Sequence, residues 1–243
     1  MPEGPSIVIL RELIADLQLE GTKVLQVIGT TALDKKRMEG EKVLAFKTWG
    51  KHFLICFKGF ALRIHLMMFG TYRINEPKEV KPRIGFIFKD NEIDFYTCSL
   101  AFIEGDLDDV YDWSADIMSA KYDIKKTVKK LAEHQEDLVC DVLLNQNLFA
   151  GSGNIIKNEV LYQIGVQPQS KIKDLPAAKL KALATHAKTY AFDFLKWKKE
   201  YTLSKHWEVY SKKICPKKHP IVKENLGKNK RVSYYCETCQ KLY

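Results

Sequence analysis

The sequence predicts a multidomain α+β protein, with an antiparallel β-sandwich led by a helix, then a helical domain, then a C-terminal zinc ribbon. Apolar residues follow a helical period close to the N-terminus and again beyond residue 121. Between these stretches, short segments rich in β-branched and aromatic residues are separated by glycines. Three of the six cysteines are gathered in residues 215–243.

The composition is that of a folded chain with a basic surface. With 243 residues, 46% of them hydrophobic, the chain is long enough for two or three compact units. Lysine and arginine number 39 against 30 acidic residues, a net charge of +9 that favours a polyanionic partner. No apolar run is long enough to span a bilayer, and the N-terminus lacks the order of a signal peptide. We therefore expect an intracellular protein.

The first predicted element is an amphipathic helix over residues 5 to 19. Ile7, Leu10, Ile14 and Leu17 keep helical spacing in this stretch. A helix that starts this early places the N-terminus of the chain on a rigid element.

The residues before this helix read Met1-Pro2-Glu3-Gly4. If Met1 is removed, Pro2 presents a secondary amine, and an α-amino group titrates near pH ~8. Such an amine can attack a sugar carbon and form an iminium without first being desolvated, and the Glu3 carboxylate stands beside it. The alternative is a flexible leader in front of a helix.

An antiparallel β-sandwich is predicted from the helix to about residue 110. Glycines and an Asp-Asn pair break the β-rich segments in the manner of hairpin turns. A domain over 1–110 would therefore hold the helix and the sandwich. The expected strands are Lys23 to Ile28, Lys42 to Thr48, His52 to Lys58, Phe60 to Leu66, Thr71 to Asn75, Arg83 to Lys89 and Glu92 to Tyr96.

An all-helical domain over 123–200 is predicted next, after an acidic linker over 111–122. Its apolar residues return to helical spacing. Between two of its helices lies Gly151-Ser152-Gly153-Asn154, a tight turn whose N–H groups and helix N-terminus can face an anion. A plain turn between helices explains the same residues equally well at this point.

The C-terminal segment over 213–243 is predicted to bind a metal. Cys215 and His219 form one close pair, and Cys236 and Cys239 form a second. Four such ligands across a short loop fit tetrahedral Zn²⁺, and a site without an open position is structural. His219 is the weakest member, because Lys218 stands where a second cysteine would complete a regular C-x-x-C. The alternative is a surface histidine with unpaired thiols.

The loop between the two ligand pairs is strongly basic. From Lys212 to Arg231 there are eight basic residues and one acid, Glu224. We expect this hairpin to face phosphate groups.

Taken together, these motifs resemble the formamidopyrimidine-DNA glycosylase and endonuclease VIII family of base-excision repair enzymes. The resemblance rests on the Pro2-Glu3-Gly4 start, the Gly151-Ser152-Gly153-Asn154 turn and the ribbon ending Cys236-Glu237-Thr238-Cys239. It covers the whole chain in order. It implies a β-sandwich, a helix-two-turn-helix domain and a zinc finger, and an activity of DNA glycosylase and apurinic/apyrimidinic lyase.

The resemblance also implies three catalytic residues. Pro2 is similar to the nucleophile that attacks C1′ and forms a Schiff base, which permits β- and then δ-elimination. Glu3 is similar to the acid/base that protonates the sugar ring oxygen. Lys51, in Trp49-Gly50-Lys51-His52, is similar to the lysine that holds a phosphate near the lesion; as a lone residue it would be a solvated turn lysine.

Three further residues are implied to contact DNA. Asn154 and Arg231 are similar to the pair that holds the phosphates around a flipped nucleotide. Met68 is similar to an apolar wedge that fills the space in the duplex. Without the resemblance, Met68 would be assigned to the core.

Departures from the 8-oxoguanine branch point to the endonuclease VIII side and to oxidised pyrimidines. The Asp-Pro-Arg-Arg-Phe-Gly run of that branch is absent, since the matching residues 96–102 read Tyr-Thr-Cys-Ser-Leu-Ala-Phe. The stretch from Lys198 to Lys213 leaves little room for that branch's capping loop. Ser6 departs from both branches.

The implied partner is damaged double-stranded DNA, with single-stranded or bubble DNA left open, bound by a monomer that carries one structural Zn²⁺. Two alternatives to an oxidised-pyrimidine enzyme stay open. One is a damaged-DNA-binding protein without chemistry on the same scaffold. The other is a glycosylase that prefers 8-oxoguanine or formamidopyrimidine.

Overall fold

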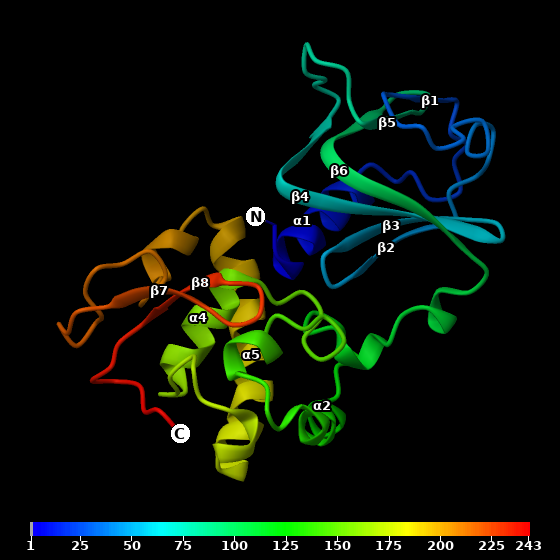
Figure 1. Cartoon of the computed structure of the whole chain (residues 1–243). Helices are drawn as coiled ribbons and strands as arrows, with labels where there is room; N and C mark the ends of the chain where they lie inside the picture. The colour runs from blue at the N-terminus through cyan, green and yellow to red at the C-terminus, as the bar shows by residue number, and fades with distance from the viewer. Residues whose placement is uncertain (1) are drawn as a thin grey trace. The chain divides into compact units, whose positions relative to one another are not determined.

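The computed structural model describes residues 2–243, and Met1 lies outside the described residues. The predicted removal of Met1 therefore has no structural counterpart here. The chain divides into two compact units, Met1–Tyr111 and Asp112–Tyr243. Figure 1 shows strands throughout the first unit and helices through most of the second.

The first unit contains one six-stranded antiparallel sheet in the order β1-β5-β6-β4-β3-β2. The strands β4 and β6 are long and pair with each other. β4 also pairs with β3, and β6 also pairs with β5, so these two strands join the two ends of the sheet. The strands are β1 (Gln26–Ile28), β2 (Ala45–Trp49), β3 (His52–Phe57), β4 (Phe60–Ile74), β5 (Ile84–Ile87) and β6 (Glu92–Glu104).

The two ends of this sheet share one core, which gives the sandwich. Phe53 on β3 lies 5.8 Å, centroid to centroid, from Phe95 on β6, although these two strands are not neighbours in the sheet. Phe95 in turn contacts Phe86 on β5 edge-on. The expected strands Phe60 to Leu66 and Thr71 to Asn75 are one strand, β4, because its pairing with β6 resumes beyond a register shift.

The helix α1 (Gly4–Ala15) covers this core, and it ends four residues before the predicted limit of residue 19. Ile7, Leu10 and Ile14 are fully buried in the core with strand residues. A proline stands in the first turn, where a missing N–H costs no helical hydrogen bond. Packing of one apolar stripe thus holds the N-terminal end of the chain on the sheet.

The second unit is helical, with a small hairpin at its end. Its core collects apolar residues from all four α-helices between residues 124 and 199. The elements are η1 (Leu107–Asp109) in the first unit, then η2 (Trp113–Ala115), α2 (Ile124–Leu131), η3 (Ala132–His134), α3 (Val139–Val142), α4 (Asn154–Gln163), η4 (Ile172–Asp174), α5 (Ala177–Lys199), η5 (Leu203–His206), β7 (Val222–Leu226) and β8 (Arg231–Tyr235).

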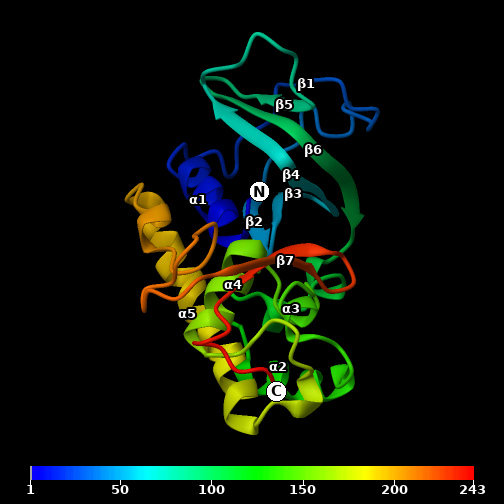
Figure 2. The same cartoon turned by 60° about the vertical axis from the view of Figure 1, so that its left-hand side comes forward.

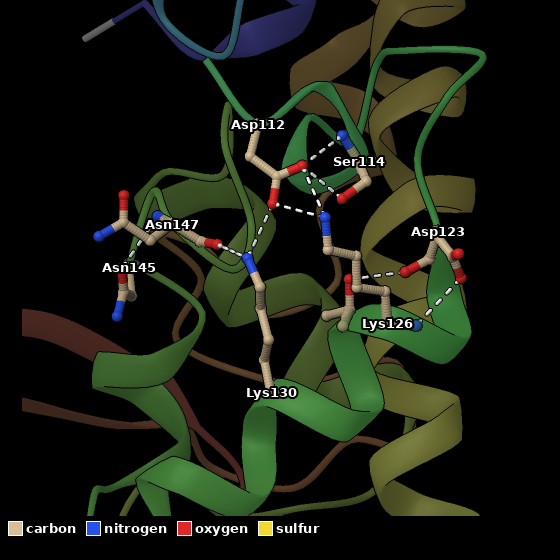
Figure 3. A network of polar contacts seen from close by, with 8 residues as sticks. Asp112, Ser114, Asp123, Lys126, Lys130, Asn145 and Asn147 are labelled. Atoms are coloured by element: carbon tan, nitrogen blue, oxygen red, sulfur yellow. Dashed lines mark hydrogen bonds and ion pairs between the residues drawn. The ribbon is translucent and has the colours of Figure 1, made fainter. Parts of the chain in front are cut away.

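The stretch 111–122, expected as a linker, is packed into the second unit over much of its length. Ile117 and Tyr122 are buried in the helical core. The Asp112 carboxylate accepts hydrogen bonds from Ser114 and from the ammonium groups of two α2 lysines, Lys126 at 3.1 Å and Lys130 at 2.9 Å (Figure 3).

These bonds define the chemistry of Asp112. Burial opposes its ionisation, but the hydrogen bonds from Ser114, Lys130 and Lys126 outweigh burial and hold the pKa of Asp112 well below its usual range. Lys130 also donates to the Asn147 carbonyl at 3.4 Å (Figure 3). The start of the second unit is therefore tied, through α2, to the loop that precedes α4.

The hairpin β7–β8 packs on α4, as both views of the fold show (Figures 1 and 2). Its strands pair in antiparallel register from Val222 with Tyr235 to Leu226 with Arg231. Within residues 2–243, none of the helices is both long and apolar enough to cross a membrane.

Candidate metal centre and nucleic-acid interface

The four predicted metal ligands meet at one point beside the hairpin. The ligand atoms of Cys215, His219, Cys236 and Cys239 all lie within 4.8 Å of one another. Cys215 Sγ is 3.9 Å from Cys239 Sγ and 3.8 Å from His219 Nδ1. Tetrahedral zinc with Zn–S of about 2.3 Å and Zn–N of about 2.0 Å places such atoms roughly 3.5–3.8 Å apart. The residues thus fit a four-coordinate metal ion, with three sulfurs and one imidazole nitrogen.

The backbone explains why His219, and not residue 218, belongs to the set. Lys218 has a left-handed backbone with φ of +65°. The Cys215 N–H donates to the His219 carbonyl at 2.9 Å, which closes the turn. Gln240 fixes the other pair, since its side chain accepts from the Cys236 N–H and donates to the Val166 carbonyl, both at 2.8 Å.

The thiols of this set differ in acidity. Burial opposes ionisation of Cys215, but hydrogen bonds from the backbone N–H groups of His219 and Lys217, with the Tyr162 hydroxyl, lower its pKa to about 6. Burial and the neighbouring sulfurs raise the pKa of Cys239 to about 11. Of these two sulfurs, Cys215 is therefore closer to the thiolate form that binds metal.

The predicted anion-binding turn leads directly into α4. Gly151 has a φ of +96°, Gly153 is the N-cap and Asn154 is the first helical residue. Asn154 is 9% exposed, and its Nδ2 donates to the Val232 carbonyl at 2.9 Å. Val232 follows Arg231, the first residue of β8. The structure thus brings the Asn154 side chain against the strand that carries Arg231.

The N-terminal residues stand at the start of α1. Glu3 is the N-cap with an extended backbone, and its carbonyl accepts the Ser6 N–H at 2.8 Å. Glu3 is only 1% exposed, whereas Pro2 is half-buried. A carboxylate removed from water beside the chain terminus is suited to proton transfer, because burial strengthens its interactions with nearby charges.

Lys51 lies in the tight turn between β2 and β3, after Gly50 with a φ of +55°. The residues on either side of this turn contact one aromatic ring. Tyr111 lies 4.8 Å from the Trp49 ring by centroids, and its hydroxyl is 3.1 Å from His52 Nδ1. Tyr111 is buried, which raises its pKa to about 12. The turn is therefore supported on both sides by the side chain of Tyr111, which lies 60 residues further along the chain.

The two histidines near this turn are held in the neutral form. Burial is the main cause that lowers the pKa of His52 to about 3, and the neighbouring His65, Arg63 and Lys51 further oppose a second positive charge there. Burial also lowers the pKa of His65, whose ring meets that of His52 edge-on at 5.3 Å. The fixed positive charge on this side of the sheet thus comes from Lys51 and Arg63.

Met68 lies in a bulge that separates the two parts of β4. The pairing of β4 with β6 shifts between Leu66 and Thr71. A Cβ at Gly70 would lie 2.7 Å from both the Met67 N and the Thr97 O, so the backbone can fold this tightly only at glycine. Met67, Met68 and Phe69 are 47%, 53% and 79% exposed. The bulge therefore presents three apolar side chains in succession, where a core position was the alternative for Met68.

Sequence reasoning missed several residues that belong to these sites or support them. Tyr111 and the exposed Phe69 are two of them. Glu159 is fully buried and accepts the backbone N–H groups of residues 208–210 at 2.7–3.0 Å. Lys157 is 1% exposed and bonds to β8. A partial signal existed, since Asn154, Lys157 and Asn158 share one face of α4 by helical spacing.

Two family models match the chain, and both describe one family. The N-terminal domain of formamidopyrimidine-DNA glycosylase matches residues 1–100. The H2TH domain of formamidopyrimidine-DNA glycosylase matches residues 114–198. The chain therefore belongs to the formamidopyrimidine-DNA glycosylase and endonuclease VIII family, as the sequence motifs predicted.

Its relatives in sequence are endonuclease 8-like proteins. The chain is 31% identical over 195 residues to endonuclease 8-like 2 of Bos taurus, across 74% of this chain and 58% of that protein. It is 31% identical over 206 residues to endonuclease 8-like 3 of Mus musculus, across 80% of this chain and 34% of that protein. The chain thus spans less than two thirds of the length of these two relatives.

Solved structures share the fold. A viral DNA glycosylase superposes with a TM-score of 0.86 at 19% identity, covering 98% of this chain and 100% of that one. Lactococcus lactis formamidopyrimidine-DNA glycosylase, non-covalently bound to DNA containing an AP site, gives 0.85 at 22% identity, covering 98% and 99%. The predicted fold class is confirmed by these matches.

Proposed function

We propose that this chain is a bifunctional DNA glycosylase and apurinic/apyrimidinic lyase of base-excision repair. The observation that carries the proposal is the N-terminus of a chain of this family: Pro2 half-buried at the start of α1, directly before a Glu3 that is 1% exposed. The chemistry needs an amine and a proton carrier next to each other, and these two residues provide them.

The amine acts first. With Met1 removed, the Pro2 nitrogen attacks C1′ of the damaged nucleotide, and the bond from C1′ to the base breaks as the base leaves with the electron pair. The N–H proton of the attacking amine passes to the departing base, which leaves as the neutral free base. Glu3 delivers a proton to the sugar ring oxygen, so the ring opens and the Pro2 nitrogen and C1′ become an iminium. Because the nitrogen of a secondary amine keeps two carbon substituents and has lost its only proton, this iminium is cationic without being protonated.

The iminium then makes strand cleavage possible. It acidifies the C2′ proton, which Glu3 removes in its carboxylate form, and the 3′ phosphate departs in β-elimination. A second elimination releases the 5′ phosphate, and water hydrolyses the remaining imine to restore the amine. Glu3 thus alternates between acid and base, and its burial keeps bulk water from competing for these protons.

Phosphate contacts hold the strand during these steps. The phosphates flanking the flipped nucleotide are bound by Asn154, at the start of α4, and by Arg231, at the start of β8. Lys51 binds a phosphate near the lesion. Met68, exposed on its bulge, enters the duplex where the nucleotide has left.

The Cys215, His219, Cys236 and Cys239 set holds one Zn²⁺. Its role is structural, since four protein ligands leave no position for substrate, and binding supplies the folding free energy of a segment too small for a core of its own. The chain acts as a monomer inside the cell on damaged duplex DNA.

Oxidised pyrimidines are the favoured substrates. Residues 96–102, where the 8-oxoguanine branch carries its Asp-Pro-Arg-Arg-Phe-Gly run, lie within β6, and all of them except Thr97, whose φ is +52°, pair with β4. Their place in a strand supports the absence of that run. The measurement is base release from duplexes carrying thymine glycol, dihydrouracil, a hydantoin or 8-oxoguanine, with the first two expected to react fastest.

The mechanism is tested by borohydride reduction on DNA containing an abasic site. A covalent adduct at the N-terminal residue, mapped by mass spectrometry, is expected from protein that lacks Met1. Protein that keeps Met1 should give none. An active preparation in which every molecule retains Met1 would overturn the Pro2 mechanism, and tight binding without any adduct would favour a damaged-DNA-binding protein.

Glu3 is tested by separating its two roles. Glu3→Gln should reduce base release by two orders of magnitude or more, roughly the contribution of a general acid. Cleavage at a preformed abasic site should fall less, because no base has to depart and the sugar is in equilibrium with an open-chain aldehyde that the amine can attack. Glu41→Gln, an exposed carboxylate of the same unit, is the control. Equal loss of both activities in Glu3→Gln would reject the assigned role.

A further inference from the structure

Lys157 is a lysine in an unusual place. It lies in the first half of α4 and is 1% exposed, among the largest fully buried side chains of the described residues. Its Nζ donates to the Val232 carbonyl at 3.0 Å and to the Ser233 Oγ at 2.8 Å. Both acceptors are on β8, and Ser233 is itself fully buried.

Two neighbours on the same face of α4 bond to the same strand. Asn154 donates from Nδ2 to the Val232 carbonyl at 2.9 Å, so this oxygen receives two donors from one helix. Asn158 accepts the Tyr234 N–H at 2.8 Å and donates to the Asn154 carbonyl at 2.7 Å. The backbone of β8 is therefore fixed over three consecutive residues by polar side chains of α4.

Packing alone does not explain a lysine here. Taking an ammonium out of water is costly unless it is well hydrogen-bonded, and an apolar side chain of similar length would fill the same space. The position is also in the first turns of a helix, whose dipole disfavours a positive charge. What the ammonium adds over an apolar side chain is a fixed orientation for the β8 backbone and a positive charge beside the helix N-terminus.

We infer that Lys157 is a positioning residue for DNA phosphate binding, which acts through Arg231. Arg231 directly precedes Val232, whose carbonyl accepts a hydrogen bond from Lys157. This bond fixes the direction of β8 at the point where the strand leaves the hairpin turn. Lys230, on the other side of Arg231, has a left-handed backbone with φ of +46°. The hydrogen bonds from Lys157 hold the strand immediately after this turn. They thereby restrict the Arg231 side chain to one orientation. The inference rests on the proposed function, in which Arg231 meets a phosphate.

The test is a double-mutant cycle between Lys157→Met and Arg231→Ala. The readout is the dissociation constant for a duplex with a tetrahydrofuran abasic analogue, measured over a range of salt concentrations. Each single variant should bind roughly tenfold more weakly, as expected from one lost charged hydrogen bond. The double variant should also lose roughly tenfold, because Lys157 has nothing left to position.

Salt dependence gives a second readout that a merely structural role would not move. Lys157→Met should lower the slope of log K against log salt by about one, the value expected for Arg231→Ala itself. Lys157→Arg, which keeps the charge and the donors, should restore most of the affinity. Lys181→Met, an exposed lysine of α5, is the control and should leave the zinc content and the melting temperature unchanged.

The outcomes separate this inference from the function on which it rests. If Arg231→Ala binds as tightly as the parent, the phosphate role of Arg231 fails. If Arg231→Ala binds the duplex more weakly than the parent but the double variant loses roughly a hundredfold in affinity, the two residues act independently and the inference is overturned. If Lys157→Met loses zinc, the cycle is run with Ser233→Ala, expected to weaken binding two- to threefold, and additivity with Arg231→Ala would again overturn it.

Discussion

Two exposed segments of this protein are shaped by opposite means. The bulge of residues 67–69 is formed by the backbone of β4, and Gly70 makes its tight course possible. The hairpin of β7 and β8 is instead held by side chains from outside it. The Asp141 carboxylate accepts the Lys228 N–H at its turn, with both oxygens at 3.0 Å, and Lys157 holds β8.

This difference predicts where each segment is sensitive. Met67, Met68 and Phe69 are 47%, 53% and 79% exposed, so we expect them to tolerate substitution, whereas Gly70 has no room for an added methyl. The hairpin has only a small apolar cluster, centred on Val209, Cys215 and Cys236, and it also depends on distant polar groups and on the four residues suited to bind a metal ion. Substitution of the exposed tip side chains should therefore reduce function without reducing stability, whereas substitution of the groups that hold the hairpin should reduce both.

Loss of a metal ligand is the largest expected effect. Cys236→Ser should lose zinc and DNA binding together, because structural zinc contributes roughly 10 kcal/mol or more to folding of such segments. Zinc content by atomic emission and binding to an abasic duplex are the measurements. Cys56→Ser, a half-buried cysteine outside the ligand set, is the control and should retain its zinc. Full zinc occupancy in Cys236→Ser would remove this residue from the ligand set.

A substitution at Gly70 comes next. Gly70→Ala forces two backbone atoms at 2.7 Å to move, and this overpacking should cost about 3 kcal/mol of the free energy of unfolding. Gly59→Ala is the matched control, since Gly59 has φ of +83° but open space around its Cβ position, and should cost only about 1 kcal/mol. Denaturant unfolding compares the two. A loss at Gly70 no larger than the loss at Gly59 would mean that the neighbouring backbone atoms yield to the added methyl and that the close approach is not what requires glycine.

The fold was predictable to the extent that local periodicity and spacing determine it. Helical spacing identified α1, although its end at Ala15 depends on packing that spacing does not encode. Glycine breaks separated the strands, but Gly70 interrupts β4 only locally, because its partner β6 continues past it to Glu104. A break in a pattern and a break in a strand look alike in sequence.

The candidate site was predictable where ligands lie close together in the chain. The Cys215 and His219 pair was readable because a turn joins them. The residues that support the site could not be predicted, because each contacts a position distant in sequence. Tyr111 contacts the turn around Lys51, and Lys157 contacts a strand more than 70 residues away. A lysine in a helical segment is normally exposed, and nothing in its own neighbourhood predicts the carbonyl and hydroxyl that make its burial possible.

Acidification should weaken the first unit through His52, by an amount that is small near neutral pH and grows as the pH falls. Its pKa is about 3 in the folded chain against 6.5 for the free side chain, with burial as the main cause. The unfolded chain therefore binds the proton more readily, so the stability that this group contributes is complete above pH 6.5 and is lost as the pH falls toward 3. His52→Gln should flatten the dependence of the melting temperature on pH in this window. An unchanged dependence would assign it to other groups.

The smallest change in stability is expected at the tip of the bulge. Met68 is 53% exposed, so Met68→Ala should alter the free energy of unfolding by no more than about 0.5 kcal/mol. If Met68 fills the space left by a flipped nucleotide, its removal should weaken binding to a lesion in duplex DNA more than to the same lesion in a single strand, which has no stack to fill. Val80→Ala, 63% exposed in the same unit, is the control. Equal losses of affinity for the two substrates would reject the wedge and leave Met68 as an ordinary surface contact. A loss of affinity confined to duplex DNA would show that a segment shaped by its backbone can carry function at little cost in stability.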